Sequence, residues 1–176
     1  MPEHNLELKA RCSGLATVGL AATRLGARFI GQEDQTDTYF EVATGRCKLR
    51  EIAGCGAELI WYNRPDQRGV RTSEYTRTPV THDHPTDSAQ TAGMRPRIKV
   101  RKKRDIYIWH NVRIHLDQVE GLGTFLELEA VLSPEEDAAK SQDRLDELCR
   151  VLEIAPEDCI GCSYADLLSE LKMREP

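Results

Sequence analysis

The sequence lacks any long apolar segment. No stretch of its 176 residues approaches the roughly 20 consecutive apolar residues that a membrane-spanning helix needs. The opening residues, MPEHNLELKARC, contain no apolar core of a secretory signal. We therefore expect a cytoplasmic protein with no membrane partner.

The chain also lacks a surplus of basic residues. Its formal net charge is −5, whereas general nucleic-acid-binding domains carry a basic excess, so we expect no nucleic-acid partner. Internal repeats and low-complexity tracts are absent too. A length of 176 residues with 40% hydrophobic content is typical of one globular domain, which we expect to span residues 1–176.

The six cysteines are too scattered for the disulfide framework of a small secreted protein. Cys159 and Cys162 have the CxxC spacing of zinc and redox sites, but a zinc site needs two further ligands and no second CxxC exists. We expect this pair to pack between two helices. His82 and His84 lie among turn-forming residues, and we expect solvated histidines in a loop over residues 81–96.

The most informative pattern that is present is the alternation of charged and apolar residues over residues 113–129. Side chains of a β-strand point alternately to its two faces, so each half of this segment has one ionic and one apolar face. The ionic positions are Arg113, His115, Asp117, Glu127 and Glu129. Gly121 and Gly123 permit a tight reversal between the halves, which predicts a β-hairpin.

Similar alternation predicts strands at residues 5–12, 46–50 and 98–108, and further strands at 58–63 and 72–80 that pair as a hairpin. Residues 28–42 are strand-like at both ends with turn-forming residues between. Helices are predicted over residues 13–25 with Ser13 as N-cap, from Ser133 as N-cap onward, and after Ser163.

Two architectures explain so many half-ionic strands. In one, an antiparallel sheet buries its apolar face under helices and exposes its ionic face to water. In the other, the sheet closes into a barrel with the ionic face inward, where charges must be paired, hydrated or bound to a ligand. Both signs of charge are present, and a polyanion carrying divalent cations would satisfy both, because basic groups bind phosphate oxygens and carboxylates hold the metal.

Several segments resemble a known family. NLELKAR is similar to the ExExK motif of the CYTH superfamily, which unites class IV adenylyl cyclases and thiamine-triphosphatase-like enzymes. The family's later motifs resemble, in the same order, QTDTYF, GRCKLRE, VRKKRDIY, RIHLDQVEGLG, FLELE and SYADLL. The resemblance implies an α+β fold in which an antiparallel eight-stranded β-barrel with flanking helices forms a tunnel for a triphosphate and a divalent metal.

The resemblance also implies roles for individual residues. The phosphate-binding positions are Lys9, Lys48, Arg50, Arg64, Lys102, Arg104 and Arg113, and among them Lys9 and Arg104 are the catalytic candidates. The metal positions, for Mg²⁺ or Mn²⁺, are Glu7, Asp117, Glu127 and Glu129. Asn5 replaces the first glutamate of ExExK, so it offers an oxygen ligand without charge. We expect His115 to tune a neighbouring carboxylate and Lys172 to lie on the surface.

The branch of the family that the chain resembles favours a class IV adenylyl cyclase-like enzyme, which converts ATP to cyclic AMP and pyrophosphate. Hydrolysis of tripolyphosphate or of an organic triphosphate is an alternative, as is a non-catalytic nucleotide- or polyphosphate-binding module in which Asn5 marks lost activity. The expected partner is a triphosphate-containing small molecule, and the chain is a monomer or a homodimer. Phe40, Tyr62 and Tyr107 are candidates for stacking on a nucleobase.

Overall fold

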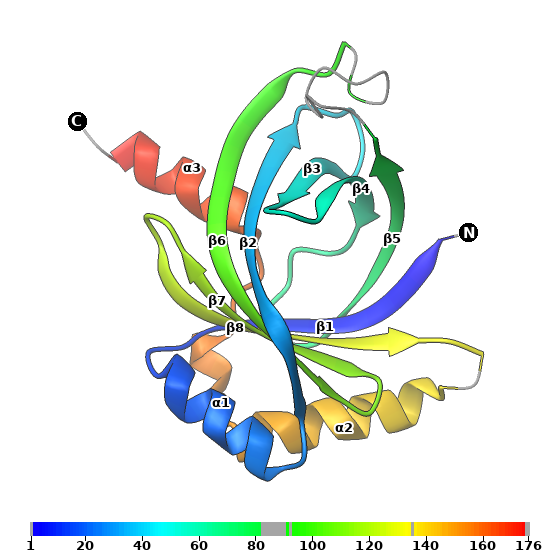
Figure 1. Ribbon diagram of the computed structural model, residues 1–176, viewed down its shortest axis with the longest axis vertical. Helices are drawn as coiled ribbons and strands as arrows, with labels where there is room; N and C mark the ends of the chain where they lie inside the picture. Colours follow the sequence, from blue (N-terminus) through cyan, green and yellow to red (C-terminus); the bar gives the residue numbers. More distant parts are fainter. Residues whose placement is uncertain (1, 82–90, 92, 135, 175–176) are drawn as a thin grey trace.

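The computed structural model describes residues 2–81, 91, 93–134 and 136–174, so His82 and His84 lie outside the described residues. Its core is a closed antiparallel barrel of eight strands with the neighbour order β1-β5-β4-β3-β2-β6-β7-β8 (Figure 1). The strands are β1 (Glu3–Arg11), β2 (Arg28–Phe40), β3 (Arg46–Ile52), β4 (Gly56–Asn63), β5 (Arg71–Val80), β6 (Pro96–Trp109), β7 (Val112–Val119) and β8 (Gly123–Leu132).

The barrel closes because β1 pairs with β5 on one side and with β8 on the other. Closure leaves no strand of the barrel with an unpaired edge, and it divides the side chains into an inner and an outer set. The prediction of an α+β fold built on an eight-stranded antiparallel barrel is therefore confirmed. The predicted hairpins are confirmed as well, since β4 pairs with β5 and β7 pairs with β8.

Strand β2 differs from the sequence prediction. The structure forms one 13-residue strand over Arg28–Phe40, where the sequence predicted strands only at the two ends. The turn-forming residues of GQEDQTDT are held extended because β2 pairs with β6 along almost its whole length and with β3 over its second half. A register shift between Phe29 and Gly31 marks a bulge in the β2–β6 ladder, which bends the strand.

Helices cover the outer face of the barrel. Helix α1 (Leu15–Arg24) and helix α2 (Ala138–Val151) pack against β7 and β8, and helix α3 (Tyr164–Arg174) packs against β6 (Figure 1). The largest hydrophobic cluster joins the outer faces of β1, β7 and β8 to α1 and α2. The apolar sides of β1, β7 and β8 are thus buried under α1 and α2, whereas Cys47 and Leu49 of β3 pack with Phe40, Leu59 and Val80. The ionic sides of these strands face the interior.

Two helix starts were predicted wrongly. Gly14, not Ser13, is the N-cap of α1, and no side chain caps that helix. Helix α2 begins after Asp137, whose side chain accepts a hydrogen bond from Ala139 N, because Ser133 is engaged in a β-bridge with Glu136. The third prediction is confirmed, since the Ser163 hydroxyl accepts a hydrogen bond from the backbone N–H of Asp166 at 3.2 Å in the first turn of α3.

The CxxC segment lies between a 3-10 helix (Pro156–Asp158) and α3. Cys159 is buried in the largest hydrophobic cluster, and Ile160 N donates a hydrogen bond to Lys9 O on β1. Both cysteines are free thiols, and among the described residues neither belongs to a group that could hold a metal. Within the described part of the chain, no helix is long and apolar enough to span a bilayer.

Candidate functional site

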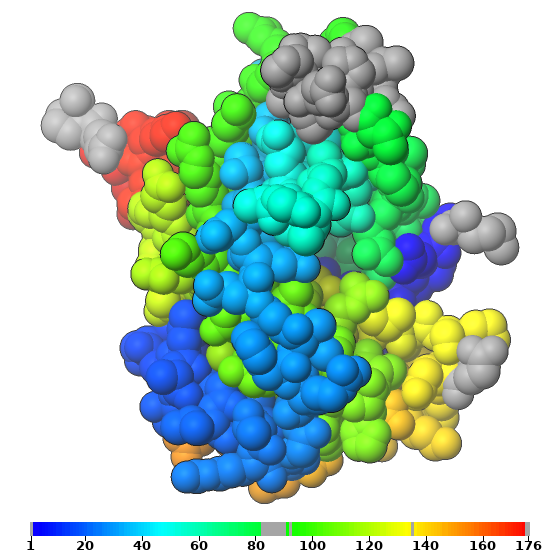
Figure 2. Space-filling model, in the orientation of Figure 1, coloured from blue at the N-terminus to red at the C-terminus, as the bar shows by residue number. Residues whose placement is uncertain are grey.

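The inward faces of the strands line one cavity of about 440 Å³. Its opening is visible as a hollow beneath the β3–β4 hairpin in Figure 2. Of the described residues, eight cationic side chains line it: Lys9, Lys48, Arg50, Arg64, Arg77, Lys102, Arg104 and Arg113. Five carboxylates do so: Glu7, Glu33, Glu58, Glu127 and Glu129. The lining is therefore formally cation-rich, although the whole chain carries a net charge of −5.

One wall gathers three cations around Asp37, and we call Lys48, Arg50 and Lys102 the cationic wall. Asp37 Oδ2 lies 2.9 Å from Lys48 Nζ and 3.3 Å from Lys102 Nζ, while Arg50 Nε donates to Oδ1 at 2.8 Å. Burial alone would raise the pKa of Asp37, but the surrounding charges, that of Arg50 first, hold it well below its usual value. Three cations thus share one carboxylate.

The pKa of Lys102 reflects both the burial of this wall and its small number of carboxylates. Burial, and then the positive charge of Arg104, lowers the pKa of Lys102 to about 7 despite the nearby Asp37 carboxylate. An anion in the cavity would restore the protonated ammonium, because an opposite charge favours the charged form.

Arg104 connects this wall to the other side of the cavity. Its guanidinium binds Asp117 in a bidentate manner, with Nε and Nη2 each 2.7 Å from a carboxylate oxygen, and Nη2 also donates to Glu127 Oε2 at 3.0 Å. Tyr164 of α3 donates its hydroxyl to Asp117 Oδ2 at 2.8 Å. Burial opposes ionisation, but the Arg104 charge lowers the pKa of Asp117 to about 2. Both oxygens of Asp117 are therefore engaged by protein groups that orient Arg104.

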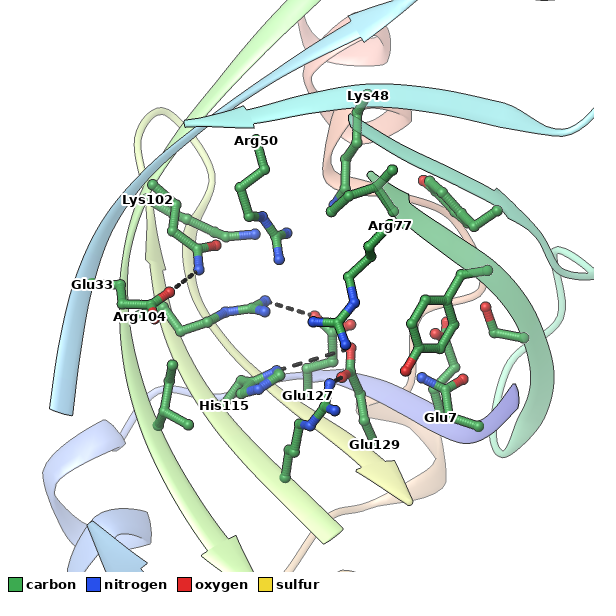
Figure 3. A pocket seen from close by; sticks show the side chains of 18 of the residues that line it. Glu7, Glu33, Lys48, Arg50, Arg77, Lys102, Arg104, His115, Glu127 and Glu129 are labelled. Carbon is green, nitrogen blue, oxygen red and sulfur yellow. Dashed lines mark hydrogen bonds and ion pairs between the residues drawn. The ribbon is translucent and has the colours of Figure 1, made fainter. Parts of the chain in front are cut away.

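Opposite the cationic wall lies a second group, His115, Glu127 and Glu129, which we call the carboxylate wall (Figure 3). Glu129 Oε2 is 3.7 Å from Arg113 Nη1, and Glu129 Oε1 is 4.0 Å from His115 Nδ1. Burial, and then the negative charge of Glu127, raises the pKa of Glu129 to about 7. Burial lowers the pKa of His115 well below its usual value, so the imidazole is neutral.

The carboxylate wall has the donor set of a metal site. One ligand atom from each of His115, Glu127 and Glu129 lies within 4.8 Å of the other two. His115 Nδ1 is buried without a hydrogen-bond partner among the described residues, and the same holds for Asn5 Oδ1, another lining atom. These residues fit a divalent cation, since oxygen and imidazole ligands converge there.

Glu7, on β1, is held by two buried arginines. Its Oε1 lies 3.0 Å from Arg71 Nη2 and 3.2 Å from Arg64 Nε. Arg71 also donates to the backbone oxygens of Gln67 and Ile160, which ties the segment before α3 to the barrel. Glu7 therefore lines the cavity with one oxygen already engaged.

The structure brings together ten of the eleven site residues that the sequence predicted, as all of them except Asp117 line the cavity. Sequence reasoning missed Asp37, Arg71 and Tyr164, which hold the lining residues in place. The strand alternation of QTDTYF was the available signal for Asp37. Of the three predicted stacking residues, Tyr62 lines the cavity. Phe40 and Tyr107 do not line it, because they pack in hydrophobic clusters. Lys172 is exposed, as expected.

A closed barrel with a cation-rich interior and an opposed carboxylate wall defines a class of protein that is organised to hold a polyanion. The CYTH domain matches residues 3–161, and the chain belongs to this family. It is 26% identical over 169 residues to a Methanocaldococcus jannaschii protein provisionally named an adenylate cyclase, with 92% of this chain and 97% of that one covered.

Solved structures agree with the fold. A Pyrococcus horikoshii protein superposes with a TM-score of 0.76 at 25% identity, over 93% of this chain and 98% of that one. A Hippeastrum protein superposes with a TM-score of 0.66 at 15% identity. That protein is provisionally named an adenylyl cyclase and is described as having a dominant triphosphatase activity. The match covers 96% of this chain and 95% of the Hippeastrum chain.

Proposed function

We propose that this protein is a metal-dependent enzyme that binds a triphosphate-containing substrate in the barrel cavity and converts ATP to cyclic AMP and pyrophosphate. The observation that carries the proposal is the cation-rich cavity inside an acidic chain. Such a cavity favours an anion of several charges over a neutral ligand. The name of the Methanocaldococcus relative supports the cyclase reaction, and the activity described for the Hippeastrum protein supports triphosphate hydrolysis as the second candidate.

The cationic wall is the proposed binding site for the terminal phosphates. Lys48, Arg50 and Lys102 come from β3 and β6 and meet at Asp37, so their positions are fixed before any ligand arrives. Preorganised cations stabilise developing negative charge without the cost of reorganising solvent. In a cyclisation, they would hold the two phosphates that leave as pyrophosphate.

Lys9 and Arg104 are the proposed catalytic residues. Lys9 Nζ lies 3.6 Å from Glu127 Oε2 and 3.9 Å from the centre of the Tyr164 ring, and Arg104 is locked by Asp117. Both therefore present positive charge at fixed positions between the two walls. Their role is to stabilise the charge that develops on the reacting phosphate when the ribose 3′-hydroxyl, or water in a hydrolase, attacks phosphorus.

Glu127 and Glu129 are the proposed metal ligands for Mg²⁺ or Mn²⁺, with Glu7 contributing through its second oxygen. A divalent cation at this wall would supply Lewis-acid polarisation of the phosphate oxygens. We assign Asp117 to positioning rather than to the metal, because Arg104 and Tyr164 already engage both of its oxygens.

Apolar residues in the cavity lining favour an organic triphosphate over inorganic tripolyphosphate. Five isoleucines line the cavity and belong to none of the hydrophobic clusters of the described residues: Ile30, Ile52, Ile60, Ile106 and Ile108. Apolar side chains in a binding site favour contact with an aromatic or apolar ligand group, and Tyr62 adds a stacking surface. A nucleobase fits this requirement, whereas tripolyphosphate has no group that would use it.

The test is to incubate the purified chain with ATP and, separately, with inorganic tripolyphosphate in the presence of Mg²⁺ or Mn²⁺. Cyclic AMP with stoichiometric pyrophosphate establishes the cyclase, and orthophosphate release establishes the hydrolase. Binding of both ligands with no turnover under any condition would overturn the enzymatic proposal in favour of a binding module.

The variant Glu127→Ala sharpens this test. It removes a proposed metal ligand together with the partner of Lys9 and Arg104, so we expect turnover to fall by about 100-fold or more. Glu120→Ala is the matched control, because Glu120 is exposed on the β7–β8 turn and forms an ion pair with the exposed Arg101. Equal loss in both variants would contradict the assigned role.

A further inference from the structure

We propose that His115 Nδ1 is a direct metal ligand that completes a His–Glu–Glu site with Glu127 and Glu129, and that this nitrogen makes the protein prefer Mn²⁺ and similar transition metals to Mg²⁺. The inference rests on the proposed function, since it concerns the metal that would serve the same cavity. It goes further by naming a ligand that the ExExK and FLELE motifs do not contain and by fixing the class of metal.

The strand register places the three residues together. His115 on β7 is directly opposite Glu127 on β8, and Arg113 is opposite Glu129, so the three inward side chains occupy adjacent positions on two paired strands. Because both strands lie within the closed barrel, their side chains cannot move far apart. Figure 3 shows His115 directed toward the two glutamates rather than out of the cavity.

The distances suit one ion. The three candidate ligand atoms lie within 4.8 Å of one another. Two ligands that bind one ion at about 2.1 Å each are separated by at most about 4.2 Å. That limit applies to two ligands on opposite sides of the ion, whereas ligands at right angles are about 3.0 Å apart. The three side chains therefore have to rotate toward one another to bind one ion.

His115 Nδ1 forms no hydrogen bond with any of the described residues. The residue is 4% exposed. A buried polar atom left without a partner costs free energy, about 1–3 kcal/mol, and a bound ion is one way in which native proteins satisfy such an atom. The nearest acceptor, Glu129 Oε1, is 4.0 Å away, which is too far for a hydrogen bond and leaves room for a shared cation.

The charges around the site also leave a place for a cation. The cations near Glu127, namely Arg104 and Lys9, approach its Oε2, and Arg113 approaches Oε2 of Glu129. The arginines and the lysine therefore sit on one side of each carboxylate. In the recorded contacts, Glu129 Oε1 faces only His115.

The ligand set determines the metal. Mg²⁺ prefers oxygen ligands and retains much of its water, whereas the divalent transition metals also bind at sites that include nitrogen, with an affinity that is lowest for Mn²⁺ and rises toward Co²⁺. Asn5 strengthens this expectation, because replacing a carboxylate by a neutral amide removes a charged oxygen ligand that a hard cation would favour. The site is thereby shifted from an all-carboxylate set toward a mixed nitrogen and oxygen set.

The experiment is pulsed electron paramagnetic resonance of Mn²⁺ bound to the untagged full chain labelled with ¹⁵N-histidine, without substrate. We expect a directly coordinated ¹⁵N signal in the wild type that disappears in His115→Asn. The matched control is His110→Asn, since His110 lies on the β6–β7 turn at a φ of 52° that asparagine tolerates, and it should retain the signal.

Titration of the same proteins gives a second readout. His115→Asn should weaken Mn²⁺ binding by about 10-fold or more, in line with losses seen when groups around a metal are altered, and leave Mg²⁺ binding nearly unchanged. Bound Mn²⁺ without nitrogen coupling would overturn the His115 assignment but leave the proposed function intact. Absence of Mn²⁺ binding would overturn this inference, while the substrate assays would judge the function separately.

Discussion

The cationic wall and the carboxylate wall face each other across one cavity and have opposite charge imbalances. Each contains a group that titrates near neutrality. Burial and the Arg104 charge lower the pKa of Lys102 to about 7, and burial and the Glu127 charge raise the pKa of Glu129 to about 7. Both shifts arise first from burial, which disfavours the charged form, and next from a neighbouring charge of the same sign.

The difference between the walls lies in their internal counter-charges. The cationic wall has a dedicated and fully buried carboxylate, Asp37, which fixes three cations in place. The carboxylate wall is balanced by cations that lie outside it, since Arg104 is shared between Asp117 and Glu127, Lys9 lies 3.6 Å from Glu127, and Arg113 lies 3.7 Å from Glu129. These cations approach Oε2 of each glutamate, and Glu129 Oε1, on the side of His115, is the oxygen that we propose for a metal.

Replacing Asp37 should have the largest effect on stability. Asp37→Asn leaves the cationic wall without its carboxylate, and breaking a buried ion pair costs about 3–5 kcal/mol in the free energy of unfolding. Denaturant titration measures this loss, and tripolyphosphate should restore more stability to the variant than to the wild type. Asp105→Asn is the control, because Asp105 is only half-buried and accepts a hydrogen bond from the neutral side chain of Gln32. Equal stability of the two variants would contradict the role of Asp37.

The Lys102 pKa predicts a pH dependence of the same wall. The folded pKa of about 7 lies below the value of 10.5 for a free lysine, so between these values the unfolded chain binds more protons. Stability should therefore rise with pH from about 7 to 10.5, relative to Lys102→Met, which lacks the titrating group. Thermal unfolding of both proteins across this range measures the difference. Parallel curves would show that Lys102 keeps an ordinary pKa.

Arg50→Ala should have a smaller but more specific effect, on binding. The substitution removes one cation of the cationic wall, while Lys48 and Lys102 still neutralise Asp37. We expect the affinity for tripolyphosphate to fall by about 10-fold, which corresponds to about 1.4 kcal/mol. Calorimetric titration measures this change, with Arg101→Ala as control because Arg101 is exposed and pairs with Glu120. Similar affinities of the two variants would place the anion outside the cavity.

Alternation along a strand assigns side chains to its two faces, but it left an open sheet and a closed barrel as alternatives, and the family resemblance predicted the barrel. Lys48 and Arg50, or Glu127 and Glu129, could be placed on one face from their spacing alone. The continuity of β2 could not, because pairing with β6 overrides the turn propensity of its central residues.

Alternation could indicate the face on which Asp37 lies, but the sequence could not give the partners of the supporting residues. Asp37 and Arg71 act through partners that are distant in the chain, Arg50 and Glu7 respectively. Tyr164 reaches Asp117 only because α3 packs against the barrel. Periodicity gives the face of a residue but not its partner across the interior. Phe40 and Tyr107 were proposed for stacking on a base although alternation places them on the opposite face from Tyr39 and Ile106, which line the cavity.

The account depends on the two walls holding different parts of one ligand. The most direct test is the crystal structure of the protein with Mn²⁺ and a non-hydrolysable ATP analogue, in which anomalous scattering locates the metal. The predicted result is Mn²⁺ bound by Glu127 and Glu129, with the terminal phosphates against Lys48, Arg50 and Lys102. A nucleotide bound on the outer surface, with the cavity filled only by water, would contradict it.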